Sequence, residues 1–192
     1  MGVLHGGSVV LYDQIFQPEK LVAIEYLGNR VAALDAYIVN HARAAMVRPY
    51  YGVNQADRPK MEQILNLEFP DRDIDLIVDD ASHLYDETRR AFNICFPYLK
   101  KGGLYVIEDW AWAHWSGDYW QKDNDYFKDR LALSNILIEL FMLTASRPEF
   151  IENIVVEPSI ITVTRGSGTL PDGEFDMENH YLLRGKIFNA PL

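Results

Sequence analysis

Residues 74–83, IDLIVDDASH, and residues 96–110, FPYLKKGGLYVIEDW, are the two stretches that decide the fold. Each contains a short apolar run typical of a buried strand, IDLIV in the first and LYVI in the second. Between them, residues 86–99 place apolar side chains at helical spacing. A strand, a helix and a second strand in this order predict a βαβ unit, in which the two strands run parallel.

The same alternation of strand-like and helical segments extends toward the N-terminus. Besides the strands at residues 74–79 and 104–108, we predict strands at residues 21–26 and 49–53 and helices at residues 8–17, 31–46 and 57–67. This alternation is typical of a largely parallel sheet covered by helices.

The last third of the chain follows a different pattern. An aromatic loop, residues 110–126, leads to a long helix at about residues 128–146. Residues 151–157 and 160–165 are two strand-like runs separated only by a Pro-Ser pair, so they predict an antiparallel hairpin. We therefore predict one α/β domain over residues 1–192, with a Rossmann-like, mostly parallel sheet, helices on both faces and a C-terminal antiparallel hairpin.

The composition excludes several classes of partner. The 192-residue chain carries 28 acidic and 18 basic residues, which gives a formal net charge of −10. A general electrostatic grip on nucleic acid or on an anionic membrane requires clustered Lys and Arg, so we expect neither partner. A small-molecule partner fits this composition better.

The cysteine content and the hydropathy pattern predict a cytoplasmic protein. Cys95 is the single cysteine, so the chain can form neither an intrachain disulfide nor a thiolate metal site. The most apolar stretch, residues 131–145, is too short to span a bilayer, and residues 1–10 lack the pattern of a signal peptide. Residues 131–143 are apolar almost all round, which predicts a core helix or a self-association surface in a homo-oligomer.

Acidic residues follow two strands of the predicted sheet. Asp79 and Asp80 end the first of these strands, and Glu108 and Asp109 end the second. The carboxyl ends of neighbouring parallel strands meet at one edge of the sheet, where such folds bind ligands. We expect Asp80, Glu108 and Asp109 to form an all-oxygen cluster suited to a hard cation such as Mg²⁺, with His83 above it. The alternative is that these carboxylates cap helices or face solvent.

A second feature is the N-terminal glycine motif. Gly2, Gly6 and Gly7 precede Ser8 and a helical pattern, so the backbone can approach a ligand closely and the helix N-terminus offers free N–H groups. Glu25 lies near the end of the next strand, where nucleotide-binding folds place an acid for ribose hydroxyls. Together these residues predict an adenosyl site, whereas the glycines alone would favour a flexible N-terminus.

Aromatic side chains crowd the loop after the second acidic strand. Trp110 and Trp112 follow the acids so closely that we expect them to contact substrate, because aromatic rings stack on sugars and exclude water. The alternative is ordinary packing of this loop against the long helix.

The two opening stretches resemble the metal-dependent S-adenosylmethionine (SAM) O-methyltransferases that act on sugars of macrolides and related natural products. The resemblance extends through GVLHGGSV (residues 2–9), LVAIEY (21–26) and GVNQAD (52–57), and it covers residues 2–115. The DDxSH and EDW motifs are its most specific part. It implies a class I methyltransferase fold, SAM as the methyl donor and Mg²⁺ or another hard divalent cation.

The resemblance also implies roles for residues at the matching positions. It gives the metal ligands as Asp80, Glu108 and Asp109, and the catalytic base as His83. It places Gly2, Gly6 and Gly7 against the methionine part of the cofactor, Glu25 at the ribose, Gln55 or Asp57 near the adenine, and Asp79 and Ser82 at the border of the cofactor pocket. The implied reaction is methyl transfer to a hydroxyl of a sugar or a small polyol-bearing metabolite.

One departure from the family pattern opens two alternatives. In the family the glycine motif follows a first strand, whereas here Gly2 follows Met1 directly, so we expect the first strand to be absent. The first alternative is a catalytically silent or truncated methyltransferase-fold protein that acts as a binding module. The second is a cephalosporin-hydroxylase-like relative. A nicotinamide dehydrogenase is disfavoured because GVLHGGS does not give GxGxxG.

Overall fold

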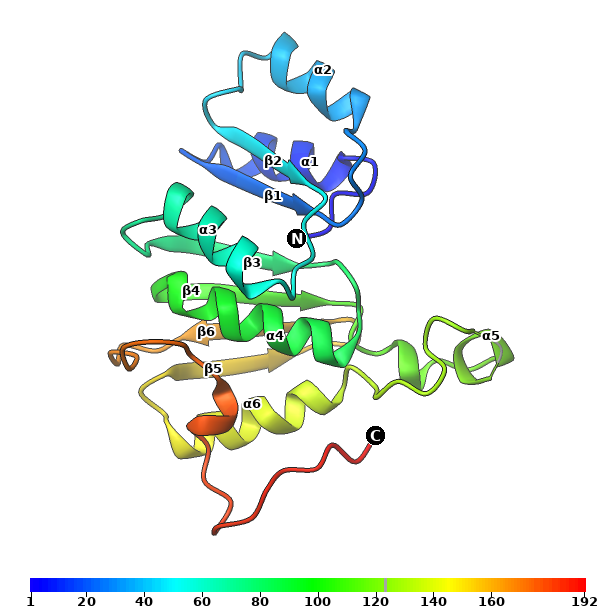
Figure 1. Cartoon of the computed structure of the whole chain (residues 1–192), viewed down its shortest axis with the longest axis vertical. Helices are drawn as coiled ribbons and strands as arrows, with labels where there is room; N and C mark the ends of the chain where they lie inside the picture. Colours follow the sequence, from blue (N-terminus) through cyan, green and yellow to red (C-terminus); the bar gives the residue numbers. More distant parts are fainter. Residues whose placement is uncertain (123) are drawn as a thin grey trace.

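Strands and helices alternate along the chain in the computed structural model, which describes residues 1–122 and 124–192 (Figure 1). The first half contains α1 (Gly7–Phe16), β1 (Leu21–Glu25), α2 (Ala32–Asn40), β2 (Val47–Tyr51), α3 (Arg58–Glu68), β3 (Ile74–Asp79) and α4 (Tyr85–Cys95). The second half contains η1 (Phe96–Tyr98), β4 (Leu99–Glu108), η2 (Trp112–His114), α5 (Asp118–Gln121), α6 (Asn135–Ser146), β5 (Ile151–Val156), β6 (Ile160–Arg165) and η3 (Met177–Asn179).

The strands form two sheets. In the smaller sheet β1 pairs in parallel with β2, and in the larger sheet the order is β3-β4-β6-β5. The β3–β4 pair is parallel, whereas β6 runs antiparallel to both β4 and β5. The predicted α/β class, the parallel β3–β4 unit and the C-terminal hairpin are therefore confirmed.

The two sheets lie edge to edge, and the first residues of the chain join them. Figure 1 shows the N-terminus between β1 and β3. The Met1 amino group donates to Val78 O at 2.5 Å, and Asp80 N donates to Met1 O at 3.2 Å. On the other side, Gly2 N donates to Ile24 O at 2.9 Å. Within the described residues no strand lies between β1 and β3.

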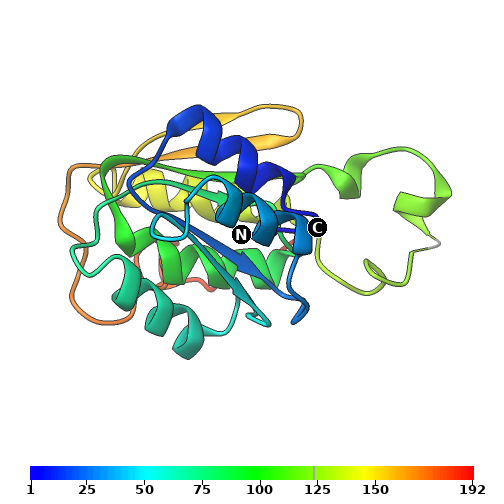
Figure 2. The ribbon, with the colours of Figure 1, turned by 90° about the horizontal axis from the view of Figure 1, so that it is seen from above.

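Helices cover both faces of these sheets. Figures 1 and 2 show α3 and α4 on one face and α1 on the other. The main core lies around the larger sheet, where Phe92, Tyr105, Ile107 and Leu140 are at most 1% exposed. A second, separate core belongs to the smaller sheet and consists of Val3, Val9, Ala23, Leu34, Ile38 and Val47.

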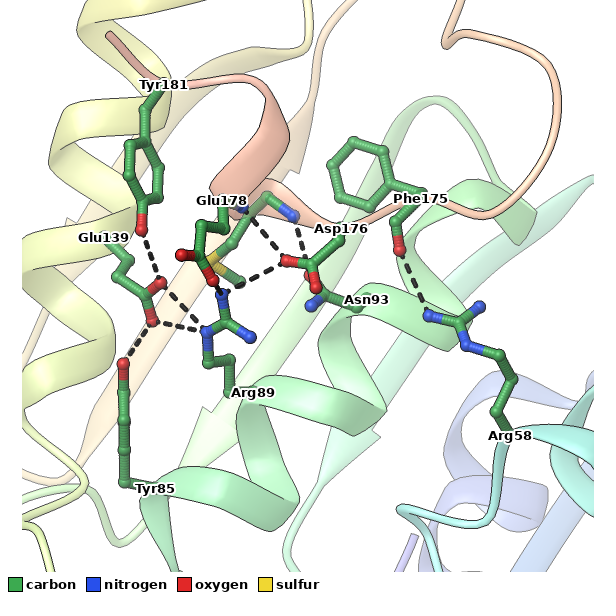
Figure 3. A network of polar contacts seen from close by, with 10 residues as sticks. Arg58, Tyr85, Arg89, Asn93, Glu139, Phe175, Asp176, Glu178 and Tyr181 are labelled. Atoms are coloured by element: carbon green, nitrogen blue, oxygen red, sulfur yellow. Dashed lines mark hydrogen bonds and ion pairs between the residues drawn. The ribbon is translucent and has the colours of Figure 1, made fainter. Parts of the chain in front are cut away.

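The chain after β6 is tied to α4 and α6 by a polar network (Figure 3). Arg89 on α4 donates to the buried Glu139 on α6 at 2.9 Å, and it also pairs with Asp176 and Glu178. Tyr181 donates to the same Glu139 at 3.0 Å. Because one carboxylate joins three segments, the C-terminal chain is fixed onto the larger half of the molecule.

Several predicted boundaries are wrong, each for a tertiary reason. The helix predicted at 31–46 ends at Asn40, and Arg43 beyond it pairs with the buried Asp13 instead. The helix predicted from about 128 begins only at Asn135. The strand predicted at 104–108 begins at Leu99, because Gly103 lets the β3 backbone approach: a Cβ there would lie 2.9 Å from Ile74 O.

The structure also tests the hydropathy prediction. Among the helices in the described part of the chain, none has the length and apolarity needed to cross a membrane.

Candidate active site

Two of the three predicted metal ligands, Asp80 and Asp109, meet the predicted base His83 beyond the carboxyl ends of β3 and β4. Asp80, His83 and Asp109 each offer a ligand atom within 4.8 Å of the others. His83 Nε2 lies 3.7 Å from Asp80 Oδ1. His83 and Asp109 both have a φ of +56°, in the left-handed region that non-glycine residues seldom adopt. Such backbone strain persists only where surrounding contacts hold it, and it concentrates at functional sites.

The C-terminal hairpin supplies the contacts that hold Asp109. Its backbone N–H donates to the carbonyl of Ser159, in the turn between β5 and β6, at 2.7 Å. The indole Nε1 of the neighbouring Trp110 donates to Glu157 O at 2.9 Å. The hairpin therefore positions the end of β4, which the sequence analysis did not anticipate.

Glu108, the last residue of β4 and the third predicted metal ligand, lies outside this group of ligand atoms and contacts α1 instead. Its Oε1 accepts a hydrogen bond from Tyr12 Oη at 3.4 Å. Burial raises the pKa of Glu108, and the nearby Asp80 carboxylate raises it further. Burial likewise raises the pKa of Asp80, with His83 opposing and Asp109 adding to the shift. The cluster thus holds partly buried carboxylates whose charges repel.

Asp79 lies on the other side of the β3 end and is 2% exposed. Its Oδ2 accepts from Gln55 Nε2 at 3.3 Å and from Tyr105 Oη at 3.5 Å. Its Oδ1 has no hydrogen-bond partner in the part of the chain that the structure describes. Burial raises the pKa of Asp79. A buried carboxylate oxygen without a partner is costly, so this position suits a ligand that donates a hydrogen bond.

Two of the three glycines in the N-terminal motif are required by close packing within the protein. Gly2 has a φ of +84°, and a Cβ there would lie 1.9 Å from Asp80 O. Gly6 has a φ of +83°, and its Cβ would lie 2.9 Å from Leu34 Cβ. Gly7 faces open space, and no side chain in the described residues caps the start of α1 before Ser8. The N-terminus of α1 is therefore the open part of this motif.

Glu25 is 8% exposed and binds the glycine segment. Its Oε2 accepts from the N–H groups of Val3 and Leu4 at 2.9 Å, and its Oε1 accepts from Leu27 N at 2.8 Å. Burial acts to raise the pKa of Glu25, but these backbone hydrogen bonds outweigh it and the pKa is lowered. Glu25, which we predicted to bind the ribose, therefore also holds the backbone of the glycine segment in place.

The remaining predicted cofactor residues have local partners too. Asp57 caps α3 by accepting from Lys60 N at 3.2 Å, whereas Gln55 is buried against Asp79. Ser82 Oγ accepts from Leu84 N at 3.3 Å. The structure therefore brings Gln55 to the β3 end and gives Asp57 the N-cap of α3.

A cavity of about 170 Å³ opens next to His83 and Asp109. The Trp112 ring lies 4.2 Å from the His83 ring, centroid to centroid. Trp112 Nε1 is buried without a hydrogen-bond partner among the described residues. The cavity is lined by His83, Leu84, Asp109, Trp110, Trp112, Ala113, Trp120, Phe127, Arg130, Leu131, Ala132, Leu133 and Leu192. Trp110 and Trp112 thus face a cavity beside the acids, as expected from their position.

The sequence analysis missed Tyr12 and the docking of Leu192. Asn135, fully buried at the start of α6, donates to Leu192 O at 2.6 Å and accepts from Leu192 N at 3.2 Å. The position of Tyr12, five residues after Gly7, could have drawn attention to it. The sequence does not show how α1 is rotated about its axis, however, so it could not predict that the Tyr12 side chain points to Glu108.

Comparison with known proteins places this site in a family. Residues 1–110 match the family model described as a methyltransferase domain. The chain belongs to this methyltransferase family. Mycinamicin VI 2''-O-methyltransferase of Micromonospora griseorubida is 33% identical over 118 residues, which cover 62% of this chain and 26% of that protein. Demethylmacrocin O-methyltransferase of Streptomyces fradiae is 46% identical over 43 residues, covering 22% of this chain and 11% of that protein.

Solved structures share the fold of this methyltransferase-domain protein. MycE methyltransferase of the mycinamycin biosynthetic pathway, in complex with Mg and SAH (S-adenosylhomocysteine), matches with a TM-score of 0.59 and 23% identity, over 88% of this chain and 43% of that chain. A putative caffeoyl-CoA O-methyltransferase from Staphylococcus aureus matches with a TM-score of 0.56 and 16% identity, over 86% and 73%. The matched residues of this chain cover only about a quarter of the length of the mycinamicin enzyme.

Proposed function

We propose that this chain is a SAM-dependent, metal-assisted O-methyltransferase that acts on a hydroxyl group of a sugar or a small polyol-bearing metabolite. The observation that carries the proposal is the convergence of Asp80, His83 and Asp109 at the β3–β4 edge of a methyltransferase domain. Relatives named as sugar and macrolide O-methyltransferases support the substrate class.

The acidic cluster fits a hard divalent cation. Asp80, Glu108 and Asp109 offer carboxylate oxygens, which Mg²⁺ and Mn²⁺ prefer. Burial and mutual repulsion raise the pKa of both Asp80 and Glu108, and a cation at this position would relieve that repulsion. In this proposal the three carboxylates hold the metal, and a structure of a fold relative in complex with Mg and SAH supports it.

The opposite side of the β3 end fits SAM. The unpartnered, buried Oδ1 of Asp79 needs a hydrogen-bond donor, which the cofactor's ammonium or hydroxyl groups offer. Gly7 faces open space at the uncapped start of α1, where N–H groups favour a carboxylate. Glu25 retains lone pairs for ribose hydroxyls beside its backbone bonds. The predicted set of Gly2, Gly6, Gly7, Ser8, Glu25, Gln55, Asp57, Asp79 and Ser82 remains our assignment for cofactor binding.

His83 is oriented to remove the proton of the substrate hydroxyl. Its Nδ1 lies 3.3 Å from the carbonyl oxygen of Glu108, and a carbonyl can only accept. The proton of the neutral ring therefore belongs on Nδ1, which leaves Nε2 as the free base. The Trp112 ring packs on His83 and keeps this orientation while excluding water. When bound, the cation lowers the pKa of a coordinated hydroxyl, and SAM supplies an electrophilic methyl.

The cavity beside His83 is the proposed substrate site. Trp110 and Trp112 would stack on the sugar, and Asp109, which lines the same cavity, would connect this site to the acidic cluster. The cavity is smaller than the roughly 300–1,000 Å³ of sites that enclose drug-sized ligands. It would thus enclose one ring and leave the rest of a larger substrate outside.

Calorimetric titration with SAH, with and without Mg²⁺, tests the cofactor proposal. We expect micromolar binding in the presence of Mg²⁺. Binding below detection in both conditions would contradict it and would favour the second candidate function, a catalytically silent methyltransferase-fold binding module. The observation behind that second candidate is the interruption between β1 and β3.

A further inference from the structure

A tyrosine on the helix after the glycine motif contacts the acidic cluster. Tyr12 lies in the middle of α1, and its hydroxyl donates to Glu108 Oε1 at 3.4 Å. We propose that Tyr12 is a positioning residue that holds the Glu108 carboxylate in the orientation required for cation binding. This role rests on the proposed function, because it presupposes a divalent cation at the cluster.

The packing of α1 fixes the direction of the Tyr12 side chain. The next residue, Asp13, is 3% exposed and accepts from Arg43 at 2.6 Å and from Tyr37 at 2.7 Å. These bonds set the rotation of α1 against α2. The Tyr12 ring also stacks on Phe16 one turn later, at 6.1 Å between centroids. The Asp13–Arg43 ion pair therefore fixes the rotation of α1, and this rotation places the Tyr12 hydroxyl next to Glu108 at the end of β4.

The chemistry of the contact suits a ligand-orienting role. A phenol hydroxyl gives Glu108 one hydrogen bond and leaves carboxylate lone pairs for a cation. Without this donor, repulsion from Asp80 favours rotation of Glu108 away from the cluster. A phenol hydroxyl with its ordinary pKa of about 10 keeps its proton at neutral pH and can donate to the carboxylate.

Mn²⁺ binding measured by electron paramagnetic resonance tests this role without a substrate. We expect Tyr12→Phe to weaken Mn²⁺ binding by about three- to tenfold, because it removes one hydrogen bond to a charged ligand. Tyr37→Phe is the matched control: it also removes a tyrosine–carboxylate hydrogen bond from the same helix pair, but the carboxylate is Asp13. We expect its Mn²⁺ affinity to equal that of the wild type.

A double-mutant cycle separates positioning from a general structural effect. In a Glu108→Ala background, Tyr12→Phe should produce no further change, because the acceptor through which Tyr12 acts has been removed. Equal Mn²⁺ affinity of Tyr12→Phe and wild type, or equal weakening by Tyr37→Phe, overturns the positioning role alone. A wild-type protein that binds no Mn²⁺ overturns the metal part of the proposed function as well.

Discussion

The half of the molecule around β1 and β2 differs from the half around β3 to β6 in how it is held together. The larger half has an extended apolar core, in which Phe92, Tyr105 and Leu140 are completely buried. The smaller half has a separate apolar cluster and depends on the buried Asp13–Arg43 ion pair. The proposed catalytic groups lie on the larger half, whereas the glycine motif and Glu25 lie on the smaller one.

The carboxylates of the two halves also differ in the direction of their pKa shifts. Hydrogen bonds lower the pKa of Asp13 and Glu25 in the smaller half, despite the opposing effect of burial. Burial and neighbouring charges raise the pKa of Asp79, Asp80 and Glu108 in the larger half. Ionised Asp13 and Glu25 therefore stabilise the fold, whereas ionisation of Asp79, Asp80 and Glu108 weakens it, as expected if these three carboxylates bind ligands.

We expect the largest effect from His83→Ala, which tests whether the catalytic groups lie on the larger half. If His83 is the base, we expect turnover to fall by roughly 10²- to 10⁴-fold, because proton transfer loses its acceptor. Methyl transfer from SAM in the presence of Mg²⁺ is the measurement, and the control is His41→Ala, just after α2 in the smaller half. Loss of substrate affinity with unchanged turnover would argue against His83 as the base.

The next largest effect is expected in the smaller half, from Asp13→Asn. Removing the charge of the buried Asp13 weakens its hydrogen bonds to Tyr37 and to the partly exposed Arg43, so we expect the free energy of unfolding to fall by about 2 kcal/mol. Urea unfolding measures this change. Asp35→Asn breaks the exposed pair with Arg30 and should cost less than about 1 kcal/mol. Equal effects of the two changes would show that the buried pair does not hold this half.

The smallest effects are expected from two matched changes of opposite sign, Glu25→Gln and Glu108→Gln. At pH 7 the first should lower the free energy of unfolding by about 1–2 kcal/mol, because three backbone N–H groups lose a charged acceptor. The second should raise it by about 0.5 kcal/mol in the absence of metal, because it removes a repelling charge.

The pH dependence of the two variants follows from the direction of each shift. The lowered pKa of Glu25 gives stability that is present above its ordinary value of 4.5 and is lost as pH falls through the lower folded value. The raised pKa of Glu108 costs stability as pH rises from 4.5 through the higher folded value. Urea unfolding at several pH values between 3 and 8 should show both differences shrinking toward acid pH. If Glu25→Gln raised the free energy of unfolding at pH 7, the proposed difference between the carboxylates of the two halves would be wrong.

Local patterns in the sequence were sufficient for the order of elements and for the acidic edge. The strand Ile74–Asp79 has the predicted bounds, and the hairpin pairs as predicted. Asp80, His83 and Asp109 meet because β3 and β4 are neighbouring parallel strands, whose carboxyl ends lie at the same edge of the sheet. These features depend on apolar runs and on the handedness of short connections, which are properties of nearby residues.

The tertiary structure alone decided how the two halves join and which partners the site residues have. Met1 and Gly2 link two sheets that share no direct strand pairing in the described chain, and Gly2 fits there because a Cβ would overlap Asp80 O. The Tyr12–Glu108 contact and the use of Glu25 by backbone N–H groups join residues 96 and 22 positions apart. Such contacts depend on how α1 is rotated against the sheet and on how the two sheets pack edge to edge. Both follow from the burial of residues far apart in the chain, so no local sequence pattern specifies them.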